Sequence, residues 1–214
     1  MTRVPLGAGE RIFFQGGAGR IEAVIDTPPG PAPPHGVALV AHPHPVYGGT
    51  LDNKVAQTLA KAFVGLGWVA VRPNFRGAGA SEGAHDHGDG ETEDLVAIAH
   101  QLGGRYPGLP LALAGFSFGA FIQTRVAKRV PVRRLVLVAP PAGLVSGGRK
   151  YVTGHVAPDT IVIHGEQDET VPLANVFEWA RPQQLPVVVI PGADHFFHRR
   201  LYLIKNIVAG AWRD

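Results

Sequence analysis

The sequence of 214 residues predicts an α/β protein with a mostly parallel sheet and helices on both faces. Short runs of apolar and β-branched residues recur along the chain, and the later ones are apolar almost throughout. Continuous apolar runs are typical of strands that are covered on both faces. Helix-length segments lie between these runs, and this alternation indicates βαβ units with right-handed crossovers. No composition break follows residue 36, so we expect residues 1–214 to form a single domain.

The first two strands are expected to form a hairpin. Ile12–Phe14 and Arg20–Asp26 flank a glycine-rich turn, so the sheet should begin antiparallel. The proline-rich stretch Thr27–Pro34 predicts a stiff turn that leads to the next strand. The remaining predicted strands are Gly36–His42, Trp68–Asn74, Pro110–Phe116, Arg134–Ala139, Thr160–His164 and Pro186–Ile190.

The first predicted helix covers Asn53–Gly65. Its apolar positions, such as Val55 and Leu59, fall on one face. Asp52 is expected as the N-cap, and Asp52 and Asn53 together are expected to cap and anchor the helix. The same periodicity predicts four further helices, at Glu91–Leu102, Phe118–Arg129, Ala174–Ala180 and Arg199–Trp212.

The composition excludes several classes of protein. The chain has no cysteine, which rules out disulfides, thiolate metal sites and a cysteine nucleophile. Its 20 Lys and Arg against 17 Asp and Glu are scattered, so we expect no nucleic-acid partner. No segment reaches the roughly 18–20 apolar residues that span a bilayer, and the N-terminus lacks the apolar region of a signal peptide. We therefore expect a cytoplasmic protein without a membrane partner.

The sharpest motif is Gly-Phe-Ser-Phe-Gly at residues 115–119, which follows an apolar strand and precedes a predicted helix. A serine on such a turn, here Ser117, stands clear of the sheet, and the flanking glycines allow the elements to approach closely. The helix N-terminus beneath it favours developing negative charge. The motif predicts a catalytic nucleophile; the alternative is a turn whose serine only caps the helix.

A serine nucleophile needs a histidine base and an acid that orients the histidine. Asp168 follows the predicted strand Thr160–His164, and His195 follows Pro186–Ile190. Open parallel sheets place their sites at these carboxyl ends of strands. The chain order Ser117, Asp168, His195 also matches one known hydrolase architecture.

Other residues compete for two of these roles. Glu166 is an alternative acid, and His198 is an alternative base, although its position indicates a helix terminus. Asp194 is adjacent to His195, and neighbouring side chains usually point apart, so we expect it to shape the loop. His164 ends a strand and is expected to be a buried, hydrogen-bonded histidine.

Two His-x-His pairs, His42/His44 and His85/His87, raise the question of a metal site. The first pair lies in a proline-rich loop, and no H-E-x-x-H helix is present. The second pair is expected in a polar surface loop at the rim of the pocket, which Arg76 holds by ion pairing. We therefore expect no metal and no cofactor.

Five stretches resemble the small, lidless bacterial α/β-hydrolases described as serine esterases. They are residues 41–55 (AHPHPVYGGTLDNKV), 72–83 (RPNFRGAGASEG), 115–119 (GFSFG), 164–172 (HGEQDETVP) and 192–197 (GADHFF). The resemblance implies a mostly parallel, roughly eight-stranded sheet and a catalytic triad of Ser117, Asp168 and His195. It implies no particular substrate, because this fold serves many reactions.

The resemblance also implies an oxyanion hole. One backbone N–H comes from the residue after the nucleophile, which is Phe118, and the other comes from the loop that contains His44. Pro43 and Pro45 have no N–H, so His44 is the expected donor and Tyr47 the alternative. Many relatives carry His-Gly where this chain has His-Pro.

The segment Pro140–Asp159 is too short for a lid domain. We expect an open, shallow pocket bordered by Tyr47, Phe118, Tyr151 and Phe196, which suits small acyl substrates. The leading hypothesis is therefore a carboxylesterase-like serine hydrolase that cleaves small carboxylic esters through an acyl-enzyme. A thioesterase or peptidase with the same triad, or a non-catalytic binding protein of this fold, is the alternative, and the oligomeric state stays open.

Overall fold

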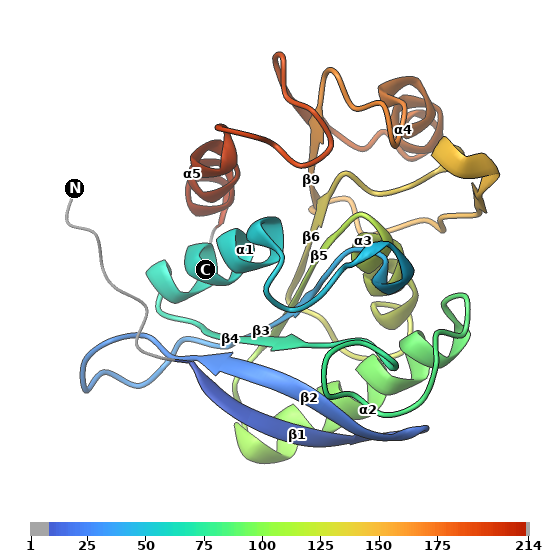
Figure 1. The fold of residues 1–214 in the computed structure, drawn as a ribbon. Helices are drawn as coiled ribbons and strands as arrows, with labels where there is room; N and C mark the ends of the chain where they lie inside the picture. The colour runs from blue at the N-terminus through green and yellow to red at the C-terminus, as the bar shows by residue number, and fades with distance from the viewer. Residues whose placement is uncertain (1–8, 213–214) are drawn as a thin grey trace.

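The computed structural model describes residues 9–212 and contains an eight-stranded sheet in the order β1-β2-β4-β3-β5-β6-β9-β10 (Figure 1). The first eight residues, on which part of the location prediction rests, lie outside the described range. The strands of this sheet are β1 (Glu10–Gly16), β2 (Gly19–Asp26), β3 (Val37–Ala41), β4 (Val69–Pro73), β5 (Leu111–Phe116), β6 (Arg134–Val138), β9 (Ile161–Gly165) and β10 (Val187–Ile190).

Strand direction divides the sheet into two parts. β1 and β2 form the expected antiparallel hairpin, and β2 also pairs antiparallel with β4. All pairs from β4 to β10 are parallel. Every residue of β3, β4 and β9 is buried, as the apolar runs predicted. The carboxyl ends of the parallel strands therefore share one edge, where the loops after β3, β5, β9 and β10 meet.

Helices cover both faces of the sheet (Figure 1). The helices are α1 (Lys54–Gly65), α2 (Asp89–Arg105), α3 (Phe118–Val126), α4 (Leu173–Ala180) and α5 (Leu201–Ala211). α1 and α5 pack on one face, where Phe63, Trp68 and Trp212 contribute to the core. α2 and α3 pack on the other face, and α4 extends that layer over β9. The core is thus two apolar layers separated by the sheet.

The N-terminus of α1 confirms the role expected for Asn53 and corrects the one expected for Asp52. The side chain of Asn53 accepts hydrogen bonds from the backbone N–H groups of Val55 (2.9 Å) and Ala56 (3.4 Å), so Asn53 is the cap. Asp52 does not cap the helix, because the helix begins one residue later than Asp52 would require. Its carboxylate lies 3.7 Å from the guanidinium of Arg72 instead.

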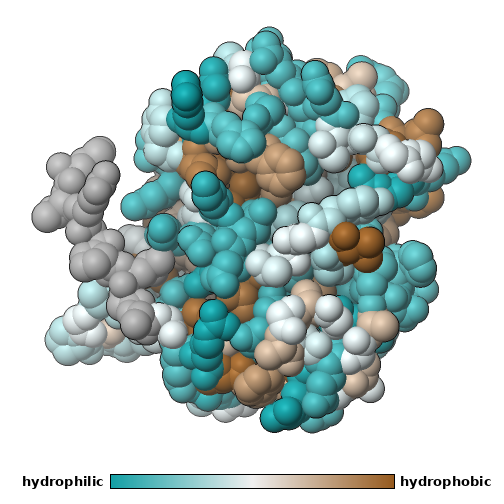
Figure 2. All heavy atoms as spheres, in the orientation of Figure 1, coloured by the Kyte–Doolittle hydropathy of each residue, from teal (hydrophilic) through white to brown (hydrophobic). Residues whose placement is uncertain are grey.

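The segment between β6 and β9 is short and carries no lid. It contains β7 (Gly143–Leu144), a 3₁₀ turn η2 (Ser146–Gly148) and β8 (Lys150–Tyr151), and the two strands pair antiparallel. In the view of Figure 2, hydrophilic surface surrounds scattered hydrophobic patches. Within residues 9–212 no helix has the length and hydropathy needed to cross a bilayer.

Candidate active site

Ser117 lies on a sharp turn between β5 and α3. Its backbone has φ 53° and ψ −123°, an uncommon conformation for a residue with a side chain, and its N–H donates to the carbonyl of Val138 (2.9 Å). A Cβ at Gly115 would lie 2.5 Å from the backbone of Gly119. A Cβ at Gly119 would lie 2.4 Å from the carbonyl oxygen of His42. Both glycines are therefore needed for this turn, and the serine side chain does not cap the helix.

A chain of hydrogen bonds links Ser117 to His195 and Asp168. Nε2 of His195 lies 3.0 Å from Ser117 Oγ, and Nδ1 lies 2.7 Å from Asp168 Oδ2. A carboxylate only accepts, so Nδ1 carries the proton and the lone pair of Nε2 faces the hydroxyl. The other carboxylate oxygen of Asp168 accepts from the backbone N–H groups of Thr170 (2.9 Å) and Val171 (2.7 Å). The three side chains are thus brought together from the loops after β5, β9 and β10.

His164 lies beside the same carboxylate. It is fully buried, and its Nε2 lies 3.0 Å from the carbonyl oxygen of Val171 and 3.5 Å from Asp168 Oδ2. Burial lowers the pKa of His164 below its ordinary value. The ring is therefore neutral and donates its Nε2–H to the carbonyl. This confirms the prediction of a buried, hydrogen-bonded histidine.

The alternative acid and base have other partners. Glu166 accepts a hydrogen bond from the N–H of Gly192 (2.7 Å), which ties the loop after β9 to the loop after β10. Asp194 accepts from the backbone N–H of His198 (3.1 Å) and lies 2.5 Å from its Nδ1. Asp194 therefore shapes the loop that carries His195, as expected from the sequence.

His42 fixes the loop that follows β3. Its Nδ1–H donates to the carbonyl of Pro43 (2.6 Å), and its Nε2 accepts from the N–H of Phe75 (2.9 Å). Complete burial lowers the pKa of His42 to about 4. This neutral ring therefore joins the loop to the segment after β4, and it has no free nitrogen with which to hold a metal.

Two backbone amides beside Ser117 remain unpaired within residues 9–212. The N–H groups of His44 and Phe118 donate no hydrogen bond there. The N–H of Tyr47 already donates to the carbonyl of His44 (3.2 Å), so it is not available as a further donor. His44 and Tyr47 both line the pocket that contains Ser117, so it is the unpaired N–H of His44 that favours it over Tyr47 as the donor.

This pocket has a volume of about 340 Å³. Tyr47 and Phe196 stand at its rim with 67% and 47% of their surface exposed, in agreement with their predicted position. Its lining residues are Pro43, His44, Tyr47, Gly48, Gly49, Asn53, Ser117, Ser146, Gly147, Arg149, Thr170, His195 and Phe196. The lining contains no Asp or Glu.

The predictions for two aromatic side chains are wrong. Tyr151 does not border this pocket; it lines a separate hollow, and its ring packs against Phe121 with centroids 5.1 Å apart. The ring of Phe118 is buried at 2% exposure, between His44 (4.7 Å) and Phe75 (5.5 Å). Tyr151 lies in a two-residue strand, where the sequence has no periodicity to indicate which way a side chain points. Only the backbone of Phe118 remains available to a substrate.

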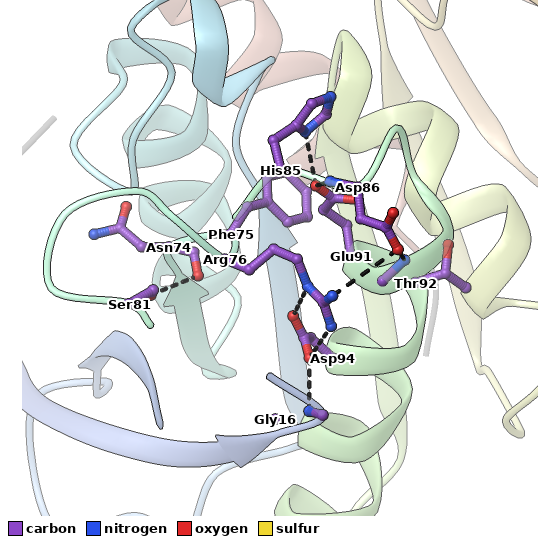
Figure 3. A network of polar contacts seen from close by, with 12 residues as sticks. Gly16, Asn74, Phe75, Arg76, Ser81, His85, Asp86, Glu91, Thr92 and Asp94 are labelled. Atoms are coloured by element: carbon purple, nitrogen blue, oxygen red, sulfur yellow. Dashed lines mark hydrogen bonds and ion pairs between the residues drawn. The ribbon is translucent and has the colours of Figure 1, made fainter. Parts of the chain in front are cut away.

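His85 lies in a loop beside the pocket, as expected, but it is less exposed than a surface residue would be. Its ring packs against His44 (centroids 4.6 Å apart) and Phe118 (5.5 Å), and its Nδ1 lies 2.7 Å from Oε1 of the buried Glu91 (Figure 3). His87 is exposed, as expected. His85 thus connects α2 to the wall of the pocket, and the sequence offered no signal for this contact.

Two acids of α2 organise the loop before it (Figure 3). Glu91 accepts from the backbone N–H groups of Asp86 (2.9 Å) and Gly88 (2.8 Å). Asp94 receives two hydrogen bonds from Arg76, from Nε (2.7 Å) and Nη2 (2.9 Å). The ion pair confirms the role predicted for Arg76. Neither acid was predicted from the sequence, although acids near the start of a helix are a known signal for such contacts.

No group of three His, Asp or Glu side chains within residues 9–212 is placed to hold a metal ion. The two His-x-His pairs are instead used in hydrogen bonding and ring packing.

Comparison with known proteins supports the same architecture. The family model described as serine aminopeptidase, S33 (Hydrolase_4) matches residues 46–159, which is more than half of the chain. An uncharacterised protein of Rickettsia prowazekii is 35% identical over 199 residues, which cover 87% of this chain and 82% of that protein. This chain belongs to the Hydrolase_4 family of α/β serine hydrolases.

Solved structures of α/β serine hydrolases resemble it over nearly their whole length. A lidless α/β serine hydrolase of Xanthomonas campestris superposes with a TM-score of 0.87 at 36% identity, covering 97% of this chain and 96% of that one. An α/β serine hydrolase homologue of Coxiella burnetii gives a TM-score of 0.86 at 38% identity, with 98% and 100% covered. The predicted lidless α/β-hydrolase fold is therefore confirmed.

Proposed function

We propose that this α/β hydrolase cleaves small carboxylic esters through an acyl-enzyme, with Ser117, His195 and Asp168 as its catalytic triad. The observation that carries the proposal is the pair of hydrogen bonds of His195, 3.0 Å to the Ser117 hydroxyl and 2.7 Å to the Asp168 carboxylate. A base within reach of a hydroxyl, with an acid behind it, is the arrangement that activates serine.

The reaction follows from the positions of the protons. Nε2 of His195 takes the hydroxyl proton as Ser117 Oγ attacks the ester carbonyl, and the carbonyl electron pair moves onto the oxygen. Asp168 stabilises the imidazolium through the Nδ1–H bond. His195 then gives the proton to the leaving alcohol as the C–O bond breaks. Water repeats the sequence on the acyl-enzyme and releases the acid.

The developing oxyanion is stabilised by backbone amides. We assign this role to the N–H groups of Phe118 and His44, which have no other acceptor within the described residues. Losing one such donor typically costs about 3–4 kcal/mol of transition-state stabilisation. The N-terminus of α3, which begins at Phe118, adds a favourable field at the same place.

The pocket supports a small substrate. Its volume is about 340 Å³, and the short segment between β6 and β9 leaves it open to solvent. Tyr47 and Phe196 at the rim offer aromatic surface to an acyl or alcohol group of a few carbons. An open site gives little cover to a long apolar chain, so short acyl groups are the preferred class.

The aminopeptidase activity in the family's description is not proposed for this chain. An aminopeptidase binds a free α-ammonium group, and the lining of this pocket contains no Asp or Glu to pair with it. A thioesterase would use the same residues, so the ester and thioester of one acyl group are compared. A thioesterase would favour the thioester by more than the intrinsic difference in reactivity.

The test is hydrolysis of short-chain p-nitrophenyl esters by the wild type and Ser117→Ala. The expected loss in kcat is about 10⁴–10⁶-fold, as is typical when a nucleophilic serine is removed. Circular dichroism of both proteins checks that the fold is intact. Unchanged activity in the variant would end the proposal.

A further inference from the structure

We propose that the substrate ester carries an anionic group, a carboxylate or a phosphate, and that Arg149 binds it. This inference rests on the proposed ester hydrolysis and specifies its substrate class. Arg149 lines the same pocket as Ser117 and His195, so a group bound by it belongs to a substrate that reaches the nucleophile.

The guanidinium of Arg149 is held in place by uncharged neighbours. Nε and Nη2 donate to the carbonyl oxygen of Ser146, at 3.2 and 3.0 Å. The charged group lies over the ring of Tyr47, 4.6 Å from its centroid, and the hydroxyl of Tyr151 is a further polar neighbour. These contacts orient the group, and none of them neutralises its charge.

The other ion pairs of the chain make this arrangement unusual. Nine arginines within residues 9–212 have a carboxylate oxygen within 4.0 Å: Arg11, Arg20, Arg72, Arg76, Arg105, Arg125, Arg129, Arg134 and Arg181. No ion pair of Arg149 is found among the described residues, although its side chain is half-buried. Arg199 and Arg200 have no ion pair in this range either, but they do not line the catalytic pocket, whereas Arg149 does.

The rest of the lining adds no negative charge. It contains no Asp or Glu, and its neutral polar side chains include Asn53 and Thr170. Partial burial, together with His85 and Arg149, lowers the pKa of His44 to about 4, so that ring is neutral near pH 7. Arg149 therefore sets the charge of the pocket. A guanidinium on a half-buried wall forms strong, often bidentate hydrogen bonds with carboxylates and phosphates.

The experiment compares esters that differ only in charge. The first pair is p-nitrophenyl hydrogen glutarate and its methyl ester, which share the acyl chain and the leaving group. The second pair, 4-carboxyphenyl acetate and its methyl ester, places the anion on the alcohol side. Rates are corrected for the hydrolysis of each ester without enzyme, which for the hydrogen glutarate includes attack by its own carboxylate, and for its hydroxide-catalysed reactivity. kcat and KM are measured for wild type, R149Q, R149K and a control, Lys150→Gln, whose exposed side chain is not part of the pocket lining.

In at least one pair, the wild type should prefer the anionic ester by about tenfold or more in kcat/KM. R149Q should remove this preference, chiefly through KM, and leave the neutral ester within about threefold. R149K should keep part of the preference for the anionic ester, and Lys150→Gln should keep all of it. Salt near 0.5 M should reduce the preference of the wild type by screening the charges.

Two results would overturn the inference. A wild type that turns over neutral and anionic esters equally in both pairs has no anion site. An R149Q variant that loses activity equally on both members of a pair shows that Arg149 only supports the loop through Tyr47 and Ser146. In either case Ser117-dependent hydrolysis of the neutral esters keeps the proposed function intact. If the wild type hydrolyses no ester at all, the proposed function fails and this inference falls with it.

Discussion

The two ends of the parallel sheet both carry hollows, but only one of them carries converging reactive groups. The hollow at the amino ends of β3, β5 and β6 is the larger, at about 520 Å³, and is lined mostly by apolar side chains such as Leu102, Leu111 and Val130. The pocket at the carboxyl ends has about 340 Å³ and contains Ser117 and His195. The size of a cavity therefore does not select the site in this molecule.

Strand direction explains the difference. At the carboxyl edge the chain leaves β5 into the N-terminus of α3, so free N–H groups meet the side chains of the following loops. The loops after β9 and β10 deliver an acid and a base to the same edge. At the amino edge the chain enters β5 and β6 after the C-termini of α2 and α3, and no comparable set of groups converges there among the lining residues. The following predictions test this contrast, from the largest expected effect to the smallest.

Asp168→Asn should lower kcat on p-nitrophenyl esters by about 10³–10⁴-fold, because an amide no longer holds the correct tautomer of His195. Asp194→Asn is the matched control. The carboxylate of Asp194 is adjacent to His195 in sequence but pairs with His198. Its replacement should therefore change kcat by less than about threefold. An equal loss in both variants would mean that Asp168 is not the orienting acid.

His44→Pro should lower kcat by about 10²–10³-fold, since it removes one oxyanion N–H. The backbone of His44, at φ −54° and ψ 120°, already suits proline. His44→Ala keeps the N–H and loses only the ring, so its loss should be much smaller. If kcat of the alanine variant falls as far as that of the proline variant, the loss comes from the ring of His44 and not from its backbone N–H.

His42 should make the protein less stable in acid. Its pKa is about 4 when folded and near 6.5 when unfolded, so the unfolded state binds the extra proton between these values. The contribution of neutral His42 to the free energy of unfolding is complete above about pH 6.5 and is lost as the pH falls towards 4. Between pH 7 and pH 5 this costs about 2 kcal/mol of unfolding free energy.

His42→Gln should show a smaller loss over the same interval, although its stability at pH 7 is lower. Urea unfolding at pH 7 and pH 5 measures the change in unfolding free energy for the wild type and for the variant. An identical pH dependence in wild type and variant would assign the effect to other groups, with the buried His164 as the next candidate.

His100→Ala should have the smallest effect. This exposed side chain lines the hollow at the amino ends of the strands. We expect kcat/KM for esters to stay within about twofold of the wild type, because surface substitutions away from a site are usually neutral. A tenfold loss would show that the larger hollow takes part in catalysis.

The sequence predicted most of the fold because its signals are local. Continuous apolar runs marked the buried parallel strands, and the glycine-rich turn marked the hairpin β1–β2. Errors occurred at boundaries, such as the cap of α1, where Asn53 and Asp52 are both good capping residues and only the start of the helix decides. The single domain over residues 1–214 and the cytoplasmic location stay predictions.

Site residues whose positions follow from chain order and strand ends were predicted from the sequence. Residues whose positions depend on packing between distant segments were not. Ser117, Asp168 and His195 each follow a recognisable strand, so the sequence could bring them together. The placement of Tyr151 and His85 depends on how short irregular segments fold back onto α2 and α3. No period or motif in the sequence encodes that direction.

The central claim is that Ser117 is the activated nucleophile, and covalent labelling tests it most directly. Wild type and Ser117→Ala are treated with a fluorophosphonate and examined by intact-mass and peptide mass spectrometry. The expected result is one phosphonyl group on the wild type, located on Ser117, and no label on the variant. Label on another residue, or equal labelling of the variant, would contradict the account.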